Sequence, residues 1–346
     1  NYFQSLSKYI RLGLAMSTTV FVAGAGGYIG KHIVSQLLSK GYTVIGSVRN
    51  DEKGERLVSL FENDNFTYVV VEEAEAKGAF DKPLKDHPHI KVFIDTASPL
   101  PIGVNYEKQL IRRTSKGIKY ILSSIKDHGP NITKVVVTSS IASCMNEKQS
   151  HDPNFVVDES KWNPDKHSVG KNNPTSAYFY AKASAEHEAW DFMKKKTHFT
   201  LATILPGYTF GPQCFDEDVS DLLETSVEIV TKIFELNKND PIPKELGLFV
   251  DVRDVAAAHI RAFELNEAQN KRLMLVSEPF SAQEIVDILH EMYPAVQLPL
   301  GHPGDKPNYK FNNIETKKIL NTDFRSLRSS IKDDYDQYLR THGIIS

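Results

Sequence analysis

The sequence predicts an α/β protein with a doubly wound parallel sheet and a smaller α/β lobe at the carboxyl terminus. Three observations lead to this prediction. Short apolar runs alternate with segments of helical periodicity up to about residue 205. A glycine-rich turn joins the first apolar run to the first helical segment. Beyond residue 212 the alternation loosens, which favours a second lobe that closes over the sheet edge and forms a small-molecule cleft with it.

The first element is the apolar run at residues 20–23, which leads into a turn with Gly24, Gly27 and Gly30 and then into the helical segment at residues 31–38. Strand, tight turn and helix form the context that a Rossmann-type dinucleotide-binding loop requires. The spacing G-x-x-G-x-x-G therefore predicts a cofactor site at this turn. The alternative is a tight turn that binds no ligand.

Each glycine of the turn has a predicted role. Gly24 permits the sharp turn out of the strand, Gly27 lets the pyrophosphate approach the backbone, and Gly30 lets the helix pack closely against the strand. The N–H groups at the start of the helix, including those of Tyr28 and Ile29, would then meet the phosphates at the positive end of the helix dipole.

The second predicted strand, at residues 42–48, is followed directly by Arg49, with Lys53 one helical turn further on. This position selects the cofactor, because a carboxylate here accepts from the ribose hydroxyl of NAD whereas an arginine accommodates the 2′-phosphate of NADP. Asp51 and Glu52 fit better as acids in the first turn of the next helix. The sequence therefore predicts NADPH, held by Arg49 and Lys53; two solvated cations are the alternative.

The rest of the first domain continues the alternation of strands and helices. Predicted strands lie at residues 66–71, 90–95, 134–140 and 199–205, and predicted helices at residues 74–86, 105–128 and from Thr175 or Ser176 through Trp190. The strand at residues 90–95 ends in Thr96, Ala97 and Ser98. Their small side chains would let the backbone pass beneath a cofactor, although a simple turn is the alternative.

The second part of the chain is less regular. Residues 141–175 are rich in Pro, Asn, Asp and Ser and are predicted to be irregular, at a length that is often functional. Predicted helices follow at residues 219–236 and 252–265, from Ser281 to His290 and at residues 331–339, with strands at residues 248–250 and 271–276. We expect an NADPH-binding Rossmann domain at residues 16–212 and mainly a substrate lobe at residues 213–346, with some segments returning to the first domain.

Tyr178 and Lys182 lie four residues apart on one predicted helix and therefore share a face. A nearby ammonium group lowers the pKa of a phenol from its usual value of about 10. We therefore expect Tyr178 to act as a general acid that protonates a carbonyl oxygen while hydride reaches the carbon. Ser140, at a strand end, would hydrogen-bond the same oxygen. Tyr180 projects from another helix face, and a surface Tyr–Lys pair without a function is the alternative.

The composition limits the other possibilities. Charged residues make up 25% of the chain and the net charge is −3, which gives no reason to expect a nucleic acid or an anionic membrane as partner. Two cysteines, Cys144 and Cys214, and histidines without ligand spacing predict no metal site and a reducing, cytoplasmic location. Residues 1–15 resemble the remnant of an expression tag, with Met16 as the natural start. We expect a monomer or a homodimer.

The motifs together resemble the extended short-chain dehydrogenase/reductase superfamily. The resemblance is carried by the glycine turn, the Thr-Ser-Ser sequence that ends at Ser140, and Tyr178 with Lys182. Within the superfamily the sequence is most similar to the yeast NADPH-dependent methylglyoxal (isovaleraldehyde) reductase group, relatives of plant dihydroflavonol reductase. The similarity extends from about residue 18 to the carboxyl terminus and includes residues 44–49, 96–99, 210–213 and 251–256.

The resemblance implies roles for individual residues. It implies a catalytic set of Ser140, Tyr178 and Lys182, contacts of Arg49 and Lys53 with the 2′-phosphate, Pro206 near the nicotinamide, and Lys182 at the nicotinamide ribose. Two positions depart from the family. Lys116 stands where the family usually has an Asn that completes a proton relay, and Asp95 stands where it usually has a His. The relay or the turnover would therefore differ.

The candidate substrate pocket is assigned by position to Leu100, Ile141, Met145, Tyr208 and Phe215. These apolar or aromatic residues suit small aliphatic or aryl carbonyl compounds, and ordinary core packing is the alternative. The leading hypothesis is an NADPH-dependent carbonyl reductase of small aldehydes and ketones, such as methylglyoxal, isovaleraldehyde and prochiral ketones. One alternative is a nucleotide-sugar epimerase or dehydratase with tightly held NAD. The other is a non-catalytic redox sensor that binds NADPH.

Overall fold

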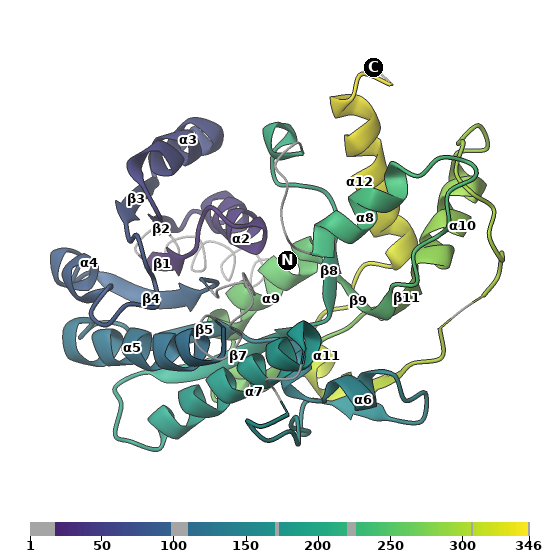
Figure 1. Cartoon of the computed structure of the whole chain (residues 1–346). Coiled ribbons are helices and arrows are strands. Elements are labelled where there is room, and N and C mark those ends of the chain that lie inside the picture. Colours follow the sequence, from purple (N-terminus) through teal and green to yellow (C-terminus); the bar gives the residue numbers. More distant parts are fainter. Residues whose placement is uncertain (1–17, 98–109, 170–172, 220–225, 306, 345–346) are drawn as a thin grey trace, which may run out of the picture.

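The computed structural model describes residues 18–97, 110–169, 173–219, 226–305 and 307–344. The main feature of this part of the chain is a parallel sheet of seven strands in the order β10-β7-β5-β4-β1-β2-β3 (Figure 1). Its strands are β1 (Thr19–Ala23), β2 (Thr43–Val48), β3 (Phe66–Val70), β4 (Ile90–Asp95), β5 (Lys134–Thr138), β7 (Thr200–Pro206) and β10 (Arg272–Leu275).

The strand order confirms the predicted doubly wound sheet. From β1 the chain builds outward through β2 and β3, and it then crosses over to build β4, β5, β7 and β10 on the other side. The direction of building therefore reverses between β1 and β4. In sheets of this kind, ligands bind beside this reversal at the carboxyl ends of the strands.

Helices cover both faces of the sheet, which is why its central strands are mostly apolar and buried. One face carries α2 (Tyr28–Ser39), α3 (Asp51–Phe61) and α9 (Val252–Glu264). The other carries α4 (Asp81–Asp86), α5 (Arg112–His128) and α7 (Pro174–Met193), and α5 and α7 lie side by side there (Figure 1). All five residues of β1 are buried between these two layers.

A second lobe is built around a three-stranded sheet of β8 (Tyr208–Phe210), β9 (Leu246–Asp251) and β11 (Glu278–Ser281). It packs with α8 (Ser226–Phe234), α10 (Ala282–Met292) and α12 (Leu327–Thr341) around its own apolar core. The remaining elements are short: α6 (Glu147–Ser150), β6 (Val156–Asp158), β12 (Lys310–Asn312) and α11 (Ile314–Leu320), with 3-10 turns at Ile141–Ser143, Asp216–Asp218 and Asn266–Ala268.

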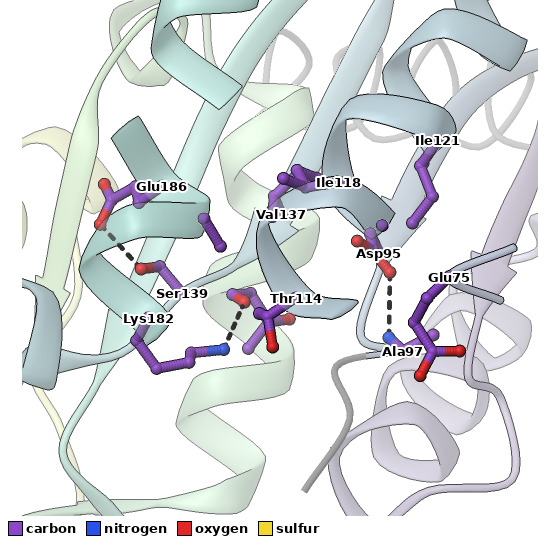
Figure 2. Close-up of a pocket in the computed structure, with 13 residues that line it drawn as sticks. Glu75, Asp95, Ala97, Thr114, Ile118, Ile121, Val137, Ser139, Lys182 and Glu186 are labelled. Atoms are coloured by element: carbon purple, nitrogen blue, oxygen red, sulfur yellow. Dashed lines mark hydrogen bonds between the residues drawn. The ribbon is translucent and has the colours of Figure 1, made fainter. Parts of the chain in front are cut away.

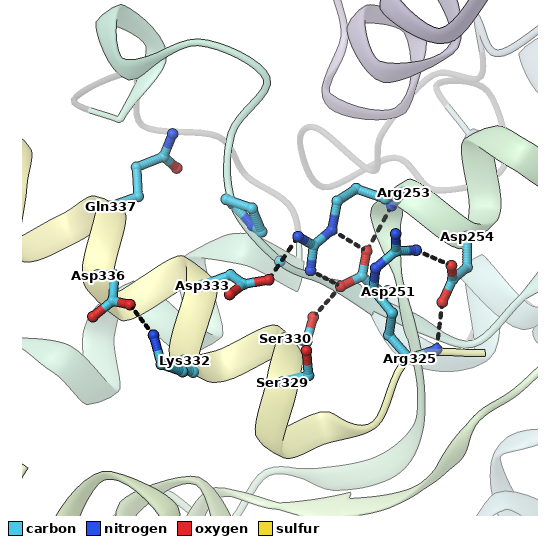
Figure 3. A network of polar contacts seen from close by, with 12 residues as sticks. Asp251, Arg253, Asp254, Arg325, Ser329, Ser330, Lys332, Asp333, Asp336 and Gln337 are labelled. Atoms are coloured by element: carbon cyan, nitrogen blue, oxygen red, sulfur yellow. Dashed lines mark hydrogen bonds and ion pairs between the residues drawn. The ribbon is translucent and has the colours of Figure 1, made fainter. Parts of the chain in front are cut away.

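A partly buried polar network attaches α12 to the start of α9 (Figure 3). Asp251 caps α9 by accepting from the backbone N–H of Arg253 at 2.7 Å. The Arg253 guanidinium bonds back to Asp251 and reaches Asp333 on α12, each at 2.7 Å. Ser330 on α12 also donates to Asp251 at 2.6 Å. Burial would raise the pKa of Asp251, but the hydrogen bonds from Arg253 and Ser330 outweigh it and lower the pKa. The network thus joins the second lobe to a helix of the main sheet.

Several element boundaries differ from those expected. The helix expected at residues 74–86 is reduced to α4, because Gly78 adopts a φ of +76°, which interrupts a right-handed helix. Helix α7 begins at Pro174, and its N-cap is Asn173 rather than Thr175 or Ser176. The Asn173 side chain accepts from the backbone N–H of Ser176 at 2.8 Å, and proline suits the first helical position.

The stretch at residues 141–175, expected to be irregular, contains a 3-10 turn, α6 and β6. Strand β6 pairs in parallel with β12, so this stretch is tied to a segment about 150 residues further along the chain. By contrast, Ser281 caps α10 as predicted, accepting from the Glu284 N–H at 3.1 Å.

The helices within the described ranges include none with the length and apolar character of a membrane span. The same part of the chain holds no group of three or more His, Cys, Asp or Glu side chains that could bind a metal ion. Residues 1–15 and Met16 lie outside the described residues, as do Ser98 and Leu100.

Candidate active site

The glycine turn has the geometry that its spacing predicts. Gly24 adopts a φ of +79°, in the left-handed region that favours glycine. A Cβ atom on Gly30 would lie 2.1 Å from the carbonyl oxygen of Gly24, so any side chain there would push α2 away from β1. A Cβ atom on Gly27 would be 3.4 Å from the same oxygen, an ordinary contact. Gly24 and Gly30 are therefore required by the fold, whereas Gly27 leaves space on the outer side of the turn.

The N-terminus of α2 fits a phosphate group. Gly27 is its N-cap, no side chain caps the helix, and the first turn contains no acidic residue. The first N–H groups of a helix have no intrahelical partner, so they can bind an anion. Tyr28 is buried and its hydroxyl donates to the carbonyl oxygen of Gly211 in the second lobe at 2.6 Å, while Ile29 packs nearby. Tyr28 and Ile29 would thus bind a cofactor through their backbones.

Arg49 directly follows β2 and precedes Asn50, the N-cap of α3, and Lys53 lies in the first turn of that helix. Both side chains are exposed, and neither forms an ion pair with a residue that the structure describes. Asp51 and Glu52 occupy the first turn of α3, as predicted. Two cations beside the glycine turn, neither of them in an ion pair with a described residue, fit the 2′-phosphate on the adenosine ribose of NADP.

Thr96 and Ala97 lie against the glycine turn. The Thr96 hydroxyl donates to the carbonyl oxygen of Ala23 at 2.7 Å, and it would be 2.8 Å from a Cβ atom on Gly24. The end of β4 therefore lies directly against the turn. That this segment passes beneath a cofactor stays a prediction.

Ser140, Tyr178 and Lys182 come together at the carboxyl end of β5. Ser140 caps the 3-10 turn that follows the strand, and its Oγ accepts from the backbone N–H of Ala142 at 3.2 Å. The Ser140 side chain also hydrogen-bonds Tyr178. Lys182 is buried, and its Nζ donates to the carbonyl oxygen of Thr138 at 3.3 Å. Helix α7 thus holds a phenol and an ammonium group against the end of one strand.

The charge states of this set differ from the expectation. Burial raises the pKa of Tyr178, and its hydrogen bond with Ser140 acts in the opposite direction. The predicted lowering of this pKa by Lys182 is therefore wrong, because the loss of water around the phenol dominates. Burial also lowers the pKa of Lys182 to about 8, although the charges of Asp95 and Glu186 oppose this.

The other predicted residues are divided between two places. Pro206 ends β7, beside the end of β5, and is buried. Ile141 and Met145 are buried in one apolar cluster close to Ser140. Tyr208 is 42% exposed and near enough to Tyr178 for their charges to interact. Phe215 instead packs on Phe61 at the end of α3, with ring centres 5.1 Å apart, on the Arg49 side of the molecule.

Sequence reasoning missed the role of Glu186. This carboxylate, one turn beyond Lys182, pairs with Arg272 and accepts from the hydroxyl of Ser139 at 2.7 Å. The signal was the spacing of Lys182 and Glu186 on one helix face, but the partner in β10 could not be found from the sequence. Lys116 is exposed on α5.

The comparisons with known proteins identify the family. A family model described as the NAD dependent epimerase/dehydratase family matches residues 20–276, which is most of the chain. The chain belongs to this family. The matched range spans the glycine turn and the seven-stranded sheet, apart from the first residue of β1.

Individual relatives are similar over nearly their whole length. A putative NADPH-dependent methylglyoxal reductase of Candida albicans is 40% identical over 340 residues, covering 94% of this chain and 100% of the relative. The NADPH-dependent methylglyoxal reductase of Saccharomyces cerevisiae is 37% identical over 341 residues, with the same two coverages. A crystal structure of Gre2 from Candida albicans in complex with NADPH has a TM-score of 0.91 at 39% identity, covering 94% of this chain and 99% of that one. These findings confirm the predicted resemblance.

Proposed function

We propose that the protein is an NADPH-dependent carbonyl reductase that converts small aldehydes and ketones, such as methylglyoxal, isovaleraldehyde and prochiral ketones, to alcohols. The observation that carries the proposal is the meeting of Ser140, Tyr178 and Lys182 at the end of β5, on the sheet edge that also carries the glycine turn. Relatives at 40% and 37% identity that are named NADPH-dependent methylglyoxal reductases support it.

The cofactor would be held by backbone and side chains already described. The uncapped start of α2 would bind the pyrophosphate, and Arg49 with Lys53 would bind the 2′-phosphate. Thr96 and Ala97 would line the path beneath the cofactor, as would Ser98, which is outside the described residues. Lys182 and Pro206 would contact the nicotinamide end.

The chemistry of the residues follows from their charge states. Bound NADPH supplies a hydride to the carbonyl carbon. Ser140 would donate a hydrogen bond to the carbonyl oxygen, on which negative charge develops. Tyr178 would give that oxygen its proton, and the raised pKa of Tyr178 means that it carries this proton at neutral pH. The Lys182 ammonium would stabilise the tyrosinate that remains.

The substrate would enter from the second lobe. Tyr208 is partly exposed, packs on Phe280 of β11 with ring centres 5.2 Å apart, and lies near Tyr178. We propose that it forms one wall of the pocket and that Ile141 and Met145 support the opposite wall from the apolar cluster beneath Ser140. Leu100, outside the described residues, stays a candidate for the same pocket. Phe215 would lie nearer the adenosine ribose of the cofactor, because it packs on Phe61 at the end of α3.

We also propose that the enzyme works in the cytoplasm. The Cys144 thiol is buried and the Cys214 thiol half-buried, and both are free, which suits a reducing compartment. Fractionation of cells that express the protein would place its activity in the soluble fraction, and activity in a membrane or secreted fraction would contradict this location.

A panel of carbonyl compounds tests the function, with NADPH and NADH measured side by side. We expect NADPH oxidation with methylglyoxal and isovaleraldehyde, and a loss of kcat on the order of 100- to 10,000-fold in Tyr178→Phe. Tyr180→Phe is the matched control, since Tyr180 contacts His167 and not the catalytic set, and it should keep wild-type activity.

Other results would favour another function. Full turnover by Tyr178→Phe would show that Tyr178 is not the catalytic acid. Tightly retained NAD in the purified protein, without turnover of the panel, would support an epimerase or dehydratase. NADPH binding without turnover of any carbonyl compound would support a redox sensor.

A further inference from the structure

A small cavity lies between the ends of β4 and β5 and the helices α5 and α7, and Lys182 is one of the residues that line it (Figure 2). Its volume of about 30 Å³ has room for one water molecule. Apolar side chains of α5 form part of its wall, and Asp95, Glu75, Glu186 and Lys182 bring charges to it. The surroundings of this cavity therefore determine how easily Lys182 keeps its proton.

The carboxylate of Asp95 is fixed in this wall. Asp95 is the last residue of β4 and is 5% exposed. Its Oδ1 accepts from the backbone N–H of Ala97 at 3.0 Å, and its second oxygen accepts no hydrogen bond from the residues that the structure describes. Asp95 thus brings a buried carboxylate to the cavity wall.

The other two carboxylates of the cavity, Glu75 and Glu186, each form an ion pair with an arginine. Glu75 pairs with Arg113 on α5 at 3.0 Å, and Glu186 pairs with Arg272 at 2.7 Å. Asp95 has no arginine partner among the described residues, and the charge that acts on it most favourably is Lys182. A buried carboxylate without an arginine partner and a buried ammonium group that line one small cavity stabilise each other's charged forms.

The charge states agree with this arrangement. Burial raises the pKa of Asp95 to about 6, with the Ala97 N–H and Lys182 acting against the rise and Glu75 adding to it. Burial lowers the pKa of Lys182 to about 8, and Asp95 is the first of the two charges that oppose the lowering. Between these two values both groups are ionised. Loss of the Asp95 charge would let Lys182 lose its proton at a lower pH.

We propose that Asp95 is a positioning residue that keeps the ammonium group of Lys182 charged across this cavity and so sets the upper end of the pH range in which the reductase works. The inference rests on the proposed function, since it assumes that Lys182 serves the reaction. Lys116 is exposed and lies outside the cavity wall, whereas Asp95 supplies a charge inside it.

The test is the pH dependence of kcat/KM for methylglyoxal with NADPH in Asp95→Asn. Asparagine keeps the volume and can still accept from Ala97, but it has no charge. We expect the basic limb of the profile to move down by about one pH unit, with little change on the acidic side of neutrality. Asp95→Glu keeps the carboxylate, so the basic limb of its pH profile should lie where it does in the wild type. Glu75→Gln is the matched control, because it removes a carboxylate from the same cavity that Arg113 already neutralises.

Thermal unfolding and NADPH titration show whether each variant is folded, and Asp95→Ser is a second charge-removing variant if asparagine is not tolerated. A profile of Asp95→Asn that overlays the wild type would overturn the inference, as would an equal loss of activity at every pH. Tyr178→Phe, measured in parallel, separates the two proposals. An active Tyr178→Phe contradicts the proposed catalytic set, whereas an inactive Tyr178→Phe with an unmoved basic limb in Asp95→Asn contradicts only the role of Asp95.

Discussion

Arg272 and Glu186 form a buried ion pair, with 2.7 Å between Nε of the arginine and Oε1 of the glutamate. Glu186 also accepts hydrogen bonds from the hydroxyls of Ser139 and Thr203, at 2.7 and 2.8 Å. One carboxylate therefore joins α7 to the carboxyl end of β5, to the first residue of β10 and to the middle of β7. Because Lys182 lies one turn earlier on α7, the pair also fixes the helix that carries the catalytic candidates.

Removal of the arginine should destabilise the protein strongly. We expect Arg272→Ala to lower the free energy of unfolding by about 3–5 kcal/mol, because the Glu186 charge would stay buried without a partner. The guanidinium also stacks on Trp162, 3.6 Å from the ring centre, and that contact would be lost too. Urea denaturation measures the change. Lys194→Ala, which breaks an exposed pair with Asp191, should cost less than about 1 kcal/mol; equal effects of the two variants would contradict the prediction.

Alanine substitutions in the glycine turn should separate folding from cofactor binding. Gly30→Ala places a Cβ 2.1 Å from a backbone oxygen, so we expect it to lower the free energy of unfolding by about 1–3 kcal/mol. Gly27→Ala makes only an ordinary contact, so it should keep its stability but bind NADPH weakly, because the methyl group faces the pyrophosphate. Gly26→Ala, whose Cβ would be 3.8 Å from Leu57, is the control for both. Tight NADPH binding by Gly27→Ala would place the pyrophosphate elsewhere.

Arg49 should determine the choice between the two nicotinamide cofactors. We expect Arg49→Ala to raise the Kd for NADPH on the order of 10- to 100-fold, the value of a charged hydrogen-bonding contact, and to leave the Kd for NADH unchanged. Lys53→Ala should act in the same direction. Fluorescence titration with both cofactors measures the effect, and Lys85→Ala on α4 is an exposed-cation control. Equal weakening of NADPH and NADH would show that Arg49 does not contact the 2′-phosphate.

His259 should make the stability depend on pH. It is fully buried, with its two ring nitrogens 2.8 Å from the Thr138 hydroxyl and the Val255 carbonyl oxygen. Burial lowers its pKa to about 4, with the hydrogen bond to Val255 acting against this. Its unfolded value is about 6.5, so below that pH the unfolded chain binds a proton that the folded protein does not.

The contribution of His259 to the free energy of unfolding should therefore fall as the pH falls, by about 1.4 kcal/mol per pH unit between about pH 6.5 and about pH 4. Urea denaturation of the wild type and of His259→Gln over this pH range isolates the contribution of His259. The opposite contribution of Asp95, whose pKa is raised, is common to both proteins and cancels in the difference. Parallel stability curves would contradict the assignment.

Most of the main domain could be predicted because its signals are local. Gly24 marks the turn after β1, since few other residues accept its φ of +79°. Tyr178 and Lys182 share a helix face whatever surrounds the helix. The boundaries were less predictable. Gly78 looked like one residue within a helical segment, but its φ of +76° interrupts the helix before α4.

Other features depended on partners that are distant in the sequence. Three residues of β6 carry too weak a pattern to predict a strand, and their pairing with β12 is what makes them one. The direction of the Tyr178 pKa was predicted wrongly, because the argument used the spacing to Lys182 and could not include the burial of the phenol.

The alternation of strands and helices in the main sheet, the dinucleotide turn and the spacing of Tyr178 and Lys182 were determined by the sequence alone, because each depends on residues that are close along the chain. The pairing of Glu186 with Arg272, and the meeting of Asp95 and Lys182 at one cavity, were decided only by the tertiary structure. The physical reason is that burial and charge pairing arise only when distant segments pack together and exclude water.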